Sequence, residues 1–187
     1  MTAKFSASAD GTKVNIGNAA EDALQIDSAA KTISPVSPYV FLGVVPGGGP
    51  AFRANRGTTD QSITTNIYTK VFMDLEAFDT NNCFDMVNSR FTPTVAGYYQ
   101  LNGTVYGVAN AGTLVIAAAN IYKNGAGYAA TYIPASASTD IIVSTSCLMY
   151  LNGSTDYAEL YGLVTGTSPI FKTGMTQFSA ALVRPAA

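Results

Sequence analysis

The chain has 187 residues, a formal net charge of −2 at pH 7, and charged side chains at only 12% of its positions. A typical globular protein has about twice that share of charged residues, so this chain has either a neutral polar exterior or a large surface covered by other subunits. Its pI of about 4.9 and the lack of any cluster of Lys and Arg argue against nucleic-acid binding.

Residues 1 to 34 predict short β-segments separated by turns. Val14 and Ile16 alternate with polar residues after "DGT", and Leu24 and Ile26 alternate after "NAAED". Each segment has one narrow apolar face and is too short to form a core alone. The spacing "KVNIGN…ALQID" resembles short repeats in the shafts and collars of phage fibres, where three chains wrap together; a loosely ordered arm is the alternative.

Residues 35 to 50 contain four prolines and four glycines, which predicts a connector. We therefore divide the chain into an N-terminal arm with its connector, residues 1–50, and a globular head, residues 51–187. The N-terminus has no apolar stretch of the length that a signal peptide needs.

The head predicts an all-β fold. Segments rich in Val, Ile, Tyr, Phe and Thr recur between Asn-Gly turn signals at 102–103, 124–125 and 152–153. Many short strands at this spacing are typical of a sandwich, a jelly roll or a barrel. The charge-free region 104–122 is long enough to span a membrane, but its asparagines, glycines and β-branched residues favour a buried pair of strands.

Five stretches in the head resemble, in order and spacing, the globular head of the complement C1q and tumour-necrosis-factor-like family. They are "AFRANR" (51–56), "FDMVNSRFTPTVAGYYQLNGTV" (84–105), "IYKNGAG" (121–127), "SCLMYLNGSTDYAELYGL" (146–163) and "FSAALV" (178–183). The positions that match the family's pattern one by one are Phe84-Asp85, Phe91, Pro93, Gly97, Tyr99, Lys123-Asn124-Gly125 and Phe178-Ser179. The chain departs from that pattern at Leu101, at an inserted Ser154-Thr155, and at Ala180.

This resemblance implies a ten-stranded jelly-roll β-sandwich that packs as a homotrimer, with one sheet of each subunit facing the three-fold axis. Neighbouring residues of a strand point to opposite faces. Tyr99 and Leu101 are therefore expected in the core, together with Phe91 and Phe178. Their neighbours Tyr98 and Gln100 are expected to face the adjoining subunit, where a tyrosine buries a large ring and keeps a partner for its hydroxyl.

A second stripe at the axis is expected from Tyr157 and Tyr161, which share parity in the segment "DYAELYG". From Phe91 to the C-terminus only six residues carry charge, which an exposed monomer would find hard to keep soluble. We therefore expect an obligate homotrimer.

The sequence offers no catalytic machinery. It contains no histidine, so Cys83 and Cys147 lack the usual base and are expected to be free thiols. Asp156 and Glu159 could pair as glycosidase carboxylates, but two carboxylates alone give little support to that chemistry. We expect neither an enzyme nor a cofactor.

A weak candidate for a calcium site is the acidic stretch "MDLEAFDTNN", which contains Asp74, Glu76 and Asp79. Oxygen ligands at this density could hold Ca²⁺, but the stretch lacks the regular spacing and the glycine of a dedicated loop. A solvated turn is the favoured interpretation.

The expected function is structural. A trimeric head on a short arm suits a phage capsid decoration (cement) protein at the outer surface of the virion, made in the host cytoplasm. Val14, Ile16, Leu24 and Ile26 would anchor it to the major capsid protein, and the knob would aid adhesion to a host-surface glycan or protein. The alternative is the receptor-binding tip of a tail fibre or tailspike. We expect neither nucleic-acid binding nor membrane insertion.

Overall fold

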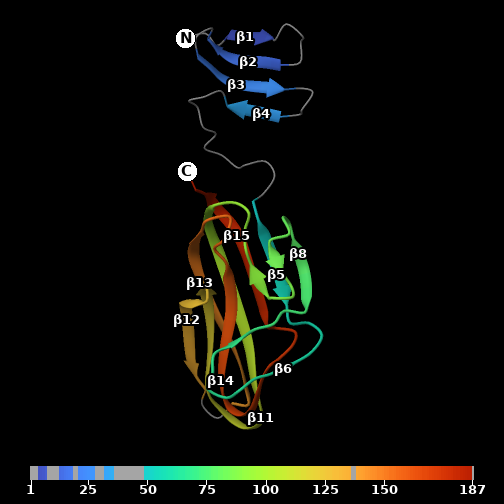
Figure 1. Cartoon of the computed structure of the whole chain (residues 1–187), viewed down its shortest axis with the longest axis vertical. Coiled ribbons are helices and arrows are strands. Elements are labelled where there is room, and N and C mark those ends of the chain that lie inside the picture. The colour runs from blue at the N-terminus through green and yellow to red at the C-terminus, as the bar shows by residue number, and fades with distance from the viewer. Residues whose placement is uncertain are drawn as a thin grey trace. The chain divides into compact units, whose positions relative to one another are not determined.

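The structure is a computed structural model that describes residues 4–7, 13–18, 21–27, 32–35, 49–135 and 138–186. The chain divides into two compact units, Met1–Pro46 and Gly47–Ala187 (Figure 1). We call the first the arm unit and the second the head. Within the described ranges, no helix is long and apolar enough to cross a membrane.

The arm unit contains a four-stranded antiparallel sheet in the order β1-β2-β3-β4. Its strands are β1 (Lys4–Ala7), β2 (Lys13–Asn18), β3 (Glu21–Asp27) and β4 (Thr32–Pro35). The register pairs Val14 with Ile26 and Ile16 with Leu24. Because directly paired residues of antiparallel strands belong to the same face, these four residues occupy one face of the sheet.

The described residues of the head form eleven strands, and all pairings among these strands are antiparallel. They are β5 (Ala51–Asn55), β6 (Gln61–Ser62), β7 (Thr69–Lys70), β8 (Leu75–Asp79), β9 (Phe84–Asp85), β10 (Arg90–Phe91), β11 (Gly97–Lys123), β12 (Ala126–Pro134), β13 (Asp140–Leu151), β14 (Ala158–Phe171) and β15 (Gln177–Pro185).

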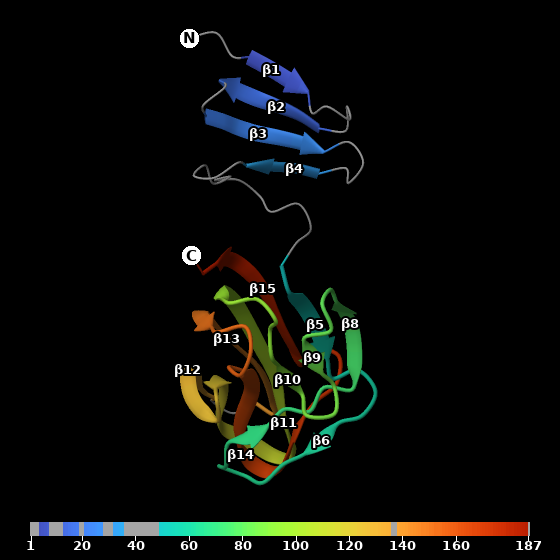
Figure 2. The same ribbon diagram turned by 45° about the horizontal axis from the view of Figure 1, so that its top comes forward.

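The long strand β11 belongs to both layers of the head (Figures 1 and 2). Its first half pairs with β13 and β15, and β15 continues through β5 to β8; we call this the first layer. Its second half pairs with β12 and β14, and β14 also carries β6, β7 and β10; we call this the second layer. The change of layer coincides with a register irregularity between Ala111 and Ile116 and a positive φ of 71° at Gly112.

The core fills the space between these layers with aromatic rings. Phe52 stacks on Phe84 and on Phe91, with ring centroids 4.4 and 4.7 Å apart, and meets the edge of Phe178 at 5.2 Å. Tyr99 packs against Phe91, and its hydroxyl donates to the carbonyl of Val95 at 2.6 Å. Such pairs add stability beyond the area that they bury. Phe91, Tyr99, Leu101 and Phe178 are all fully buried.

Candidate oligomer interface

The first layer presents an outward face on β11 and β13. Along residues 97–109 of β11 the burial alternates strictly, so Tyr98 is 45% exposed while Tyr99 is fully buried. On β13, Tyr150 pairs with Tyr98 and Leu148 pairs with Gln100, and further along Ile142 pairs with Tyr106. These pairs place their side chains on the same face.

We define the Tyr98 face as the residues Tyr98, Gln100, Ile142, Leu148 and Tyr150. Its four large side chains are between 41% and 53% exposed. The rings of Tyr98 and Tyr150 contact each other with centroids 5.5 Å apart. Burying a fully exposed large apolar side chain is worth about 1.5–3 kcal/mol, and these side chains are already about half buried, so covering each would gain roughly half of that.

The centre of the same face is polar but uncharged. The hydroxyls of Thr104 and Ser144 lie 3.0 Å apart. Around them is a depression of about 430 Å³, lined by serine, threonine, asparagine and glycine residues at 102–104, 131 and 144–146. Two charged side chains flank this centre: the exposed Arg184 of β15 is paired with Tyr98 at one end, and Asp140 at the other end accepts a hydrogen bond from the Tyr106 hydroxyl at 2.8 Å.

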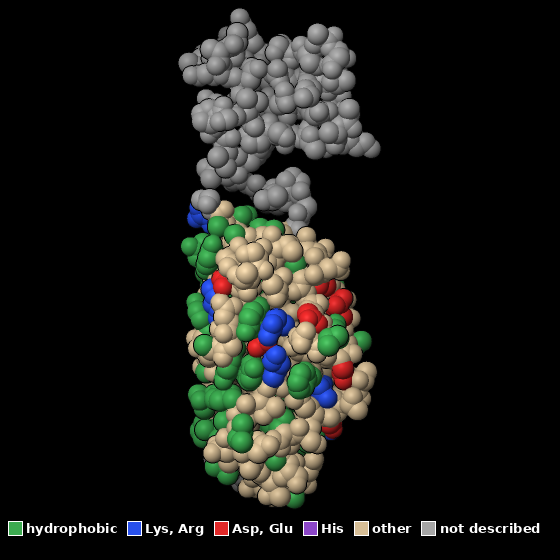
Figure 3. Space-filling model, viewed as in Figure 1, with side chains coloured by type: hydrophobic (Ala, Val, Ile, Leu, Met, Phe, Trp, Pro, Cys, Tyr) green, Lys and Arg blue, Asp and Glu red, His purple; other side chains and the backbone are tan. Residues whose placement is uncertain are grey.

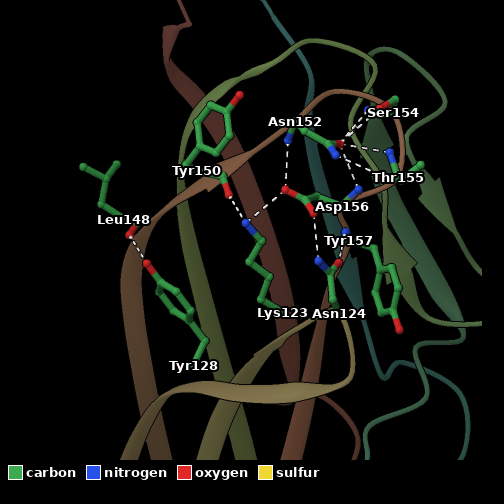
Figure 4. A network of polar contacts seen from close by, with 10 residues as sticks. All are labelled: Lys123, Asn124, Tyr128, Leu148, Tyr150, Asn152, Ser154, Thr155, Asp156 and Tyr157. Atoms are coloured by element: carbon green, nitrogen blue, oxygen red, sulfur yellow. Dashed lines mark hydrogen bonds and ion pairs between the residues drawn. The ribbon is translucent and has the colours of Figure 1, made fainter.

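The edge of the face beside β12 is held in place by a polar network (Figure 4). Lys123 donates to the carbonyl of Tyr150 at 2.7 Å and forms an ion pair with Asp156 at 3.0 Å. Asn124 donates to the other oxygen of Asp156 at 2.8 Å. These bonds, together with Lys123 and the neighbouring backbone of Asn152, lower the pKa of Asp156. They fix the turn after β11 against the loop after β13.

Apolar side chains continue along this edge. Tyr128 of β12 is 52% exposed and its hydroxyl reaches toward the carbonyl of Leu148. Figure 3 shows hydrophobic side chains gathered along the side of the head where β12 and β13 lie.

A second apolar patch lies at the opposite edge of the first layer. Phe78 of the edge strand β8 pairs with Arg53 and Leu75 pairs with Asn55. Phe78 and Leu75 are about half exposed. One subunit therefore carries two different apolar patches, one at each edge of the same layer.

Tyr157 and Tyr161 do not share the Tyr98 face. Tyr161 is in the second layer, where its ring stacks on Tyr122 with centroids 3.9 Å apart. The guanidinium of Arg90 lies 3.7 Å above the ring of Tyr157. Tyr161 lies on the side of β14 that faces away from the core, and Tyr157 lies in the loop just before β14, so neither ring adjoins the Tyr98 face.

The three carboxylates of the calcium candidate do not converge. Asp74 accepts hydrogen bonds from Gly57, Thr58 and Thr59, whereas Asp79 accepts one from the backbone N–H of Phe84 at 2.7 Å. Glu76 is exposed. Among the described residues, no group of three His, Cys, Asp or Glu side chains could hold a metal ion. The calcium interpretation is therefore corrected in favour of two loop-organising carboxylates.

The remaining reactive side chains are engaged or buried. Cys83 is buried and Cys147 is partly buried; both are free thiols, and burial raises the pKa of Cys147 to about 11. Glu159 is 2% exposed and binds Lys70 and Arg90 at 2.7 and 2.8 Å. These environments do not activate a nucleophile or pair two carboxylates across a substrate.

Comparison with known proteins identifies the fold of the head. No protein-family model matches the sequence, and no curated protein matches it. The globular domain of zebrafish complement 1qA is similar in structure, with a TM-score of 0.57 and 16% identity, over 74% of this chain and 99% of that chain. Murine APRIL solved at pH 5.0 has a TM-score of 0.56 and 8% identity, over 72% of this chain and 99% of that chain.

The structure of murine APRIL at pH 8.0 gives similar values, with a TM-score of 0.54 and 9% identity over 72% of this chain and 98% of that chain. The head therefore has a C1q/TNF-like jelly-roll fold, and the fold predicted from the sequence motifs is confirmed.

Proposed function

We propose that this C1q/TNF-like head forms a homotrimer through the Tyr98 face and serves as a non-catalytic structural component of a viral particle. Domains of this fold are typically trimeric and non-catalytic. The observation that carries the proposal is the Tyr98 face itself, which exposes four large side chains around an uncharged centre. An interface core that is depleted of charge and rich in tyrosine has this composition.

The arrangement of apolar patches favours a ring of subunits. A two-fold dimer uses one patch that pairs with itself, whereas a head-to-tail contact joins two different patches and closes when the rotation permits. The β12–β13 edge and the β8 edge are two such patches on one layer. In a three-membered ring, each subunit would place one edge against the other edge of its neighbour.

The role of capsid decoration is supported by the arm unit. The described strands of this unit form a single-layered sheet, and Phe5, Val14, Ile16, Leu24 and Ile26 occupy paired positions on one of its faces. A sheet with one apolar face needs a second layer to cover it. We infer that this layer comes from the major capsid protein, so that each trimer bridges adjoining capsid subunits and stabilises the shell by binding its assembled form.

A tail-fibre or tailspike tip is the second candidate function, because such a tip would also use a trimeric head. In either case the knob would aid adhesion to a host surface. The copy number in purified particles separates the two functions: hundreds of copies per particle indicate decoration, and a few dozen or fewer indicate a fibre or a spike.

Light scattering tests the trimer. Three chains of 19.5 kDa give a mass of 58.5 kDa. Tyr98→Arg replaces an apolar ring of the Tyr98 face with a second cation beside Arg184, its partner on β15, and should yield particles of 19.5 kDa. The control is Val87→Arg, because Val87 is 86% exposed and lies outside both patches. This variant should keep the mass of a trimer. A native mass of one chain, or an intact trimer in Tyr98→Arg, contradicts the proposed interface.

Deletion of residues 1–34 tests the arm. The truncated protein should remain a trimer, with the mass expected of three truncated chains, and should no longer bind empty capsids. Full occupancy of capsids by the deleted protein would exclude the arm as the anchor.

A further inference from the structure

The second layer carries a group of tyrosines on the side that faces away from the core. Tyr122 is at the end of β11, Tyr161 of β14 pairs with Asn120, and Tyr132 of β12 pairs with Ala118. Tyr68, just before β7, packs against Tyr122 and Tyr132 with centroids 6.3 and 6.2 Å apart. We call Tyr68, Tyr122, Tyr132 and Tyr161 the tyrosine cluster.

The rings of this cluster provide two kinds of surface. Tyr122 and Tyr161 are stacked nearly parallel, with an angle of 19° between their planes, whereas Tyr68 and Tyr132 meet edge to face. Tyr132 is the most exposed of the four, at 54%. The residues between the rings are short, since Ala118 and Asn120 occupy the outward positions of β11.

Two polar atoms at the base of the cluster have no partner. Asn120 is only 8% exposed, and its Oδ1 accepts no hydrogen bond of normal geometry from any described residue; the buried hydroxyl of Tyr68 lies beside the side chains of Asn120 and Tyr132 but forms no hydrogen bond of normal geometry with either. Leaving a buried polar group unpaired is destabilising, and native proteins generally avoid it. A hydroxyl group of a ligand would find an acceptor and a donor at this point.

The charges beside the cluster are already balanced within the chain. Lys70 and Arg90 both bind Glu159, and Arg90 also lies over the ring of Tyr157 and is paired in register with Asp85. These two cations face two carboxylates, so they leave no unpaired charge to attract an anionic ligand.

We propose that the tyrosine cluster binds a neutral saccharide. The C–H face of a sugar ring stacks on the tyrosine rings, and the sugar hydroxyls bond to the phenol hydroxyls and to Asn120. A purely apolar ligand would leave those polar groups unpaired. Tyr132 lies next to the Tyr68 hydroxyl and is 54% exposed, so its ring is available to a ligand from solvent.

This inference gives a site to the adhesive role within the proposed function and rests on that role. It does not depend on capsid attachment, because the tyrosine cluster lies on a different layer from the Tyr98 face. A variant can therefore lose capsid binding and keep saccharide binding, or lose saccharide binding and keep capsid binding, and the two losses are measured separately.

The experiment presents the full chain to an array of neutral oligosaccharides (glucans, galactans, mannans and N-acetylhexosamine oligomers) with sialylated oligosaccharides alongside. The unaltered protein should bind at least one series of neutral oligosaccharides. The Tyr132→Ala variant should bind the same series at least tenfold more weakly than the unaltered protein does. Tyr161→Phe, which keeps the ring and removes the hydroxyl, should weaken binding less than Tyr132→Ala does.

The matched control is Tyr128→Ala. Tyr128 is also an exposed tyrosine of β12, at 52%, but its hydroxyl points to Leu148 of β13, outside the cluster. Its saccharide affinity should match the unaltered protein once light scattering shows the same mass. Retention of sialylated oligosaccharides alone, of no oligosaccharide, or equal loss in Tyr128→Ala and Tyr132→Ala overturns the proposal. So does a protein ligand that binds the cluster and is not displaced by the neutral oligosaccharides.

Discussion

Asp74 organises the loop that follows β5. Its two carboxylate oxygens accept hydrogen bonds from the backbone N–H groups of Gly57, Thr58 and Thr59 and from the Thr58 hydroxyl. Burial acts to raise the pKa of Asp74, but these hydrogen bonds outweigh it and lower the pKa to about 2. The loop therefore depends on the charged form of one residue.

Asp74→Asn should lower the free energy of unfolding at pH 7 by about 1–3 kcal/mol, because charge-assisted hydrogen bonds are lost. The folded pKa lies below the unfolded value of about 3.9, so this stabilisation is complete above about pH 5, declines as the pH falls through 4 toward 2, and is lost only below the folded pKa. Urea unfolding of both proteins at pH 7 and at pH 2.5 measures the difference. A difference that does not shrink at low pH contradicts this account, and the exposed neighbour Glu76→Gln is the control.

Gly153 and Gly174 provide a second comparison at single residues. Both have a positive φ, 73° and 89°, which a residue with a Cβ adopts only at a cost of about 1–2 kcal/mol. A Cβ on Gly153 would lie 2.3 Å from the backbone nitrogen of Ala96, whereas a Cβ on Gly174 would meet no atom within 4 Å.

We therefore expect Gly174→Ala to cost about 1 kcal/mol and Gly153→Ala to cost at least twice as much. Urea unfolding at one fixed protein concentration gives both values. Equal costs would show that the backbone near Ala96 moves aside without penalty.

At the scale of elements, Glu159 ties together three strands of the second layer. It lies on β14 and forms ion pairs with Lys70 of β7 and Arg90 of β10. Both β7 and β10 contain only two residues, so they have few backbone hydrogen bonds to hold them against β14. The buried carboxylate supplies part of that attachment.

Lys70→Met should destabilise the head by about 2–4 kcal/mol, because it leaves the buried Glu159 with one cation instead of two. Lys172→Met is the matched control. Its ion pair with Asp60 has side chains that are 43% and 37% exposed, and such surface pairs contribute about 0–1 kcal/mol. Chemical denaturation of the two variants under one set of conditions compares them. If Lys70→Met and Lys172→Met lose similar amounts of unfolding free energy, the burial of Glu159 does not strengthen its ion pairs.

Strand periodicity predicts which side of a strand a residue faces, but not which layer the strand belongs to. The parity of Tyr98 and Tyr99 indicates that the two rings point to opposite sides of β11, and Tyr99 does lie in the core. Parity gave the same kind of information for Tyr157 and Tyr161, but it does not tell to which layer a strand belongs. The pairing of β14 with the second half of β11 assigns Tyr161 to the second layer, and Tyr157 lies in the loop just before β14.

The same limit applies to the tyrosine cluster. Tyr68, Tyr122, Tyr132 and Tyr161 belong to four different segments of the chain, and no local pattern links them. Only the pairing of β7, β12 and β14 around the second half of β11 brings the rings together. The unpaired Asn120 becomes visible as a feature only once its burial is known.

At the scale of the whole molecule, assembly and stability should be coupled. If the Tyr98 face is covered only in the trimer, the folded state gains stability from association, and the thermal midpoint rises with protein concentration. Tyr98→Arg should unfold at a lower temperature that no longer depends on concentration, whereas Val87→Arg should behave like the unaltered protein. Calorimetry across a hundredfold range of concentration measures this. A midpoint independent of concentration in the unaltered protein contradicts coupled assembly.

The sequence by itself determined the all-β class, the C1q/TNF-like fold and the shortage of charge. Period-two alternation and turn residues are local properties, and the shared motifs recur in a fixed order along the chain. The tertiary structure alone decided which residues share a surface. That outcome depends on the pairing of strands far apart in the sequence, which placed Tyr150 beside Tyr98, moved Tyr161 to the other layer, and separated Asp74 from Asp79.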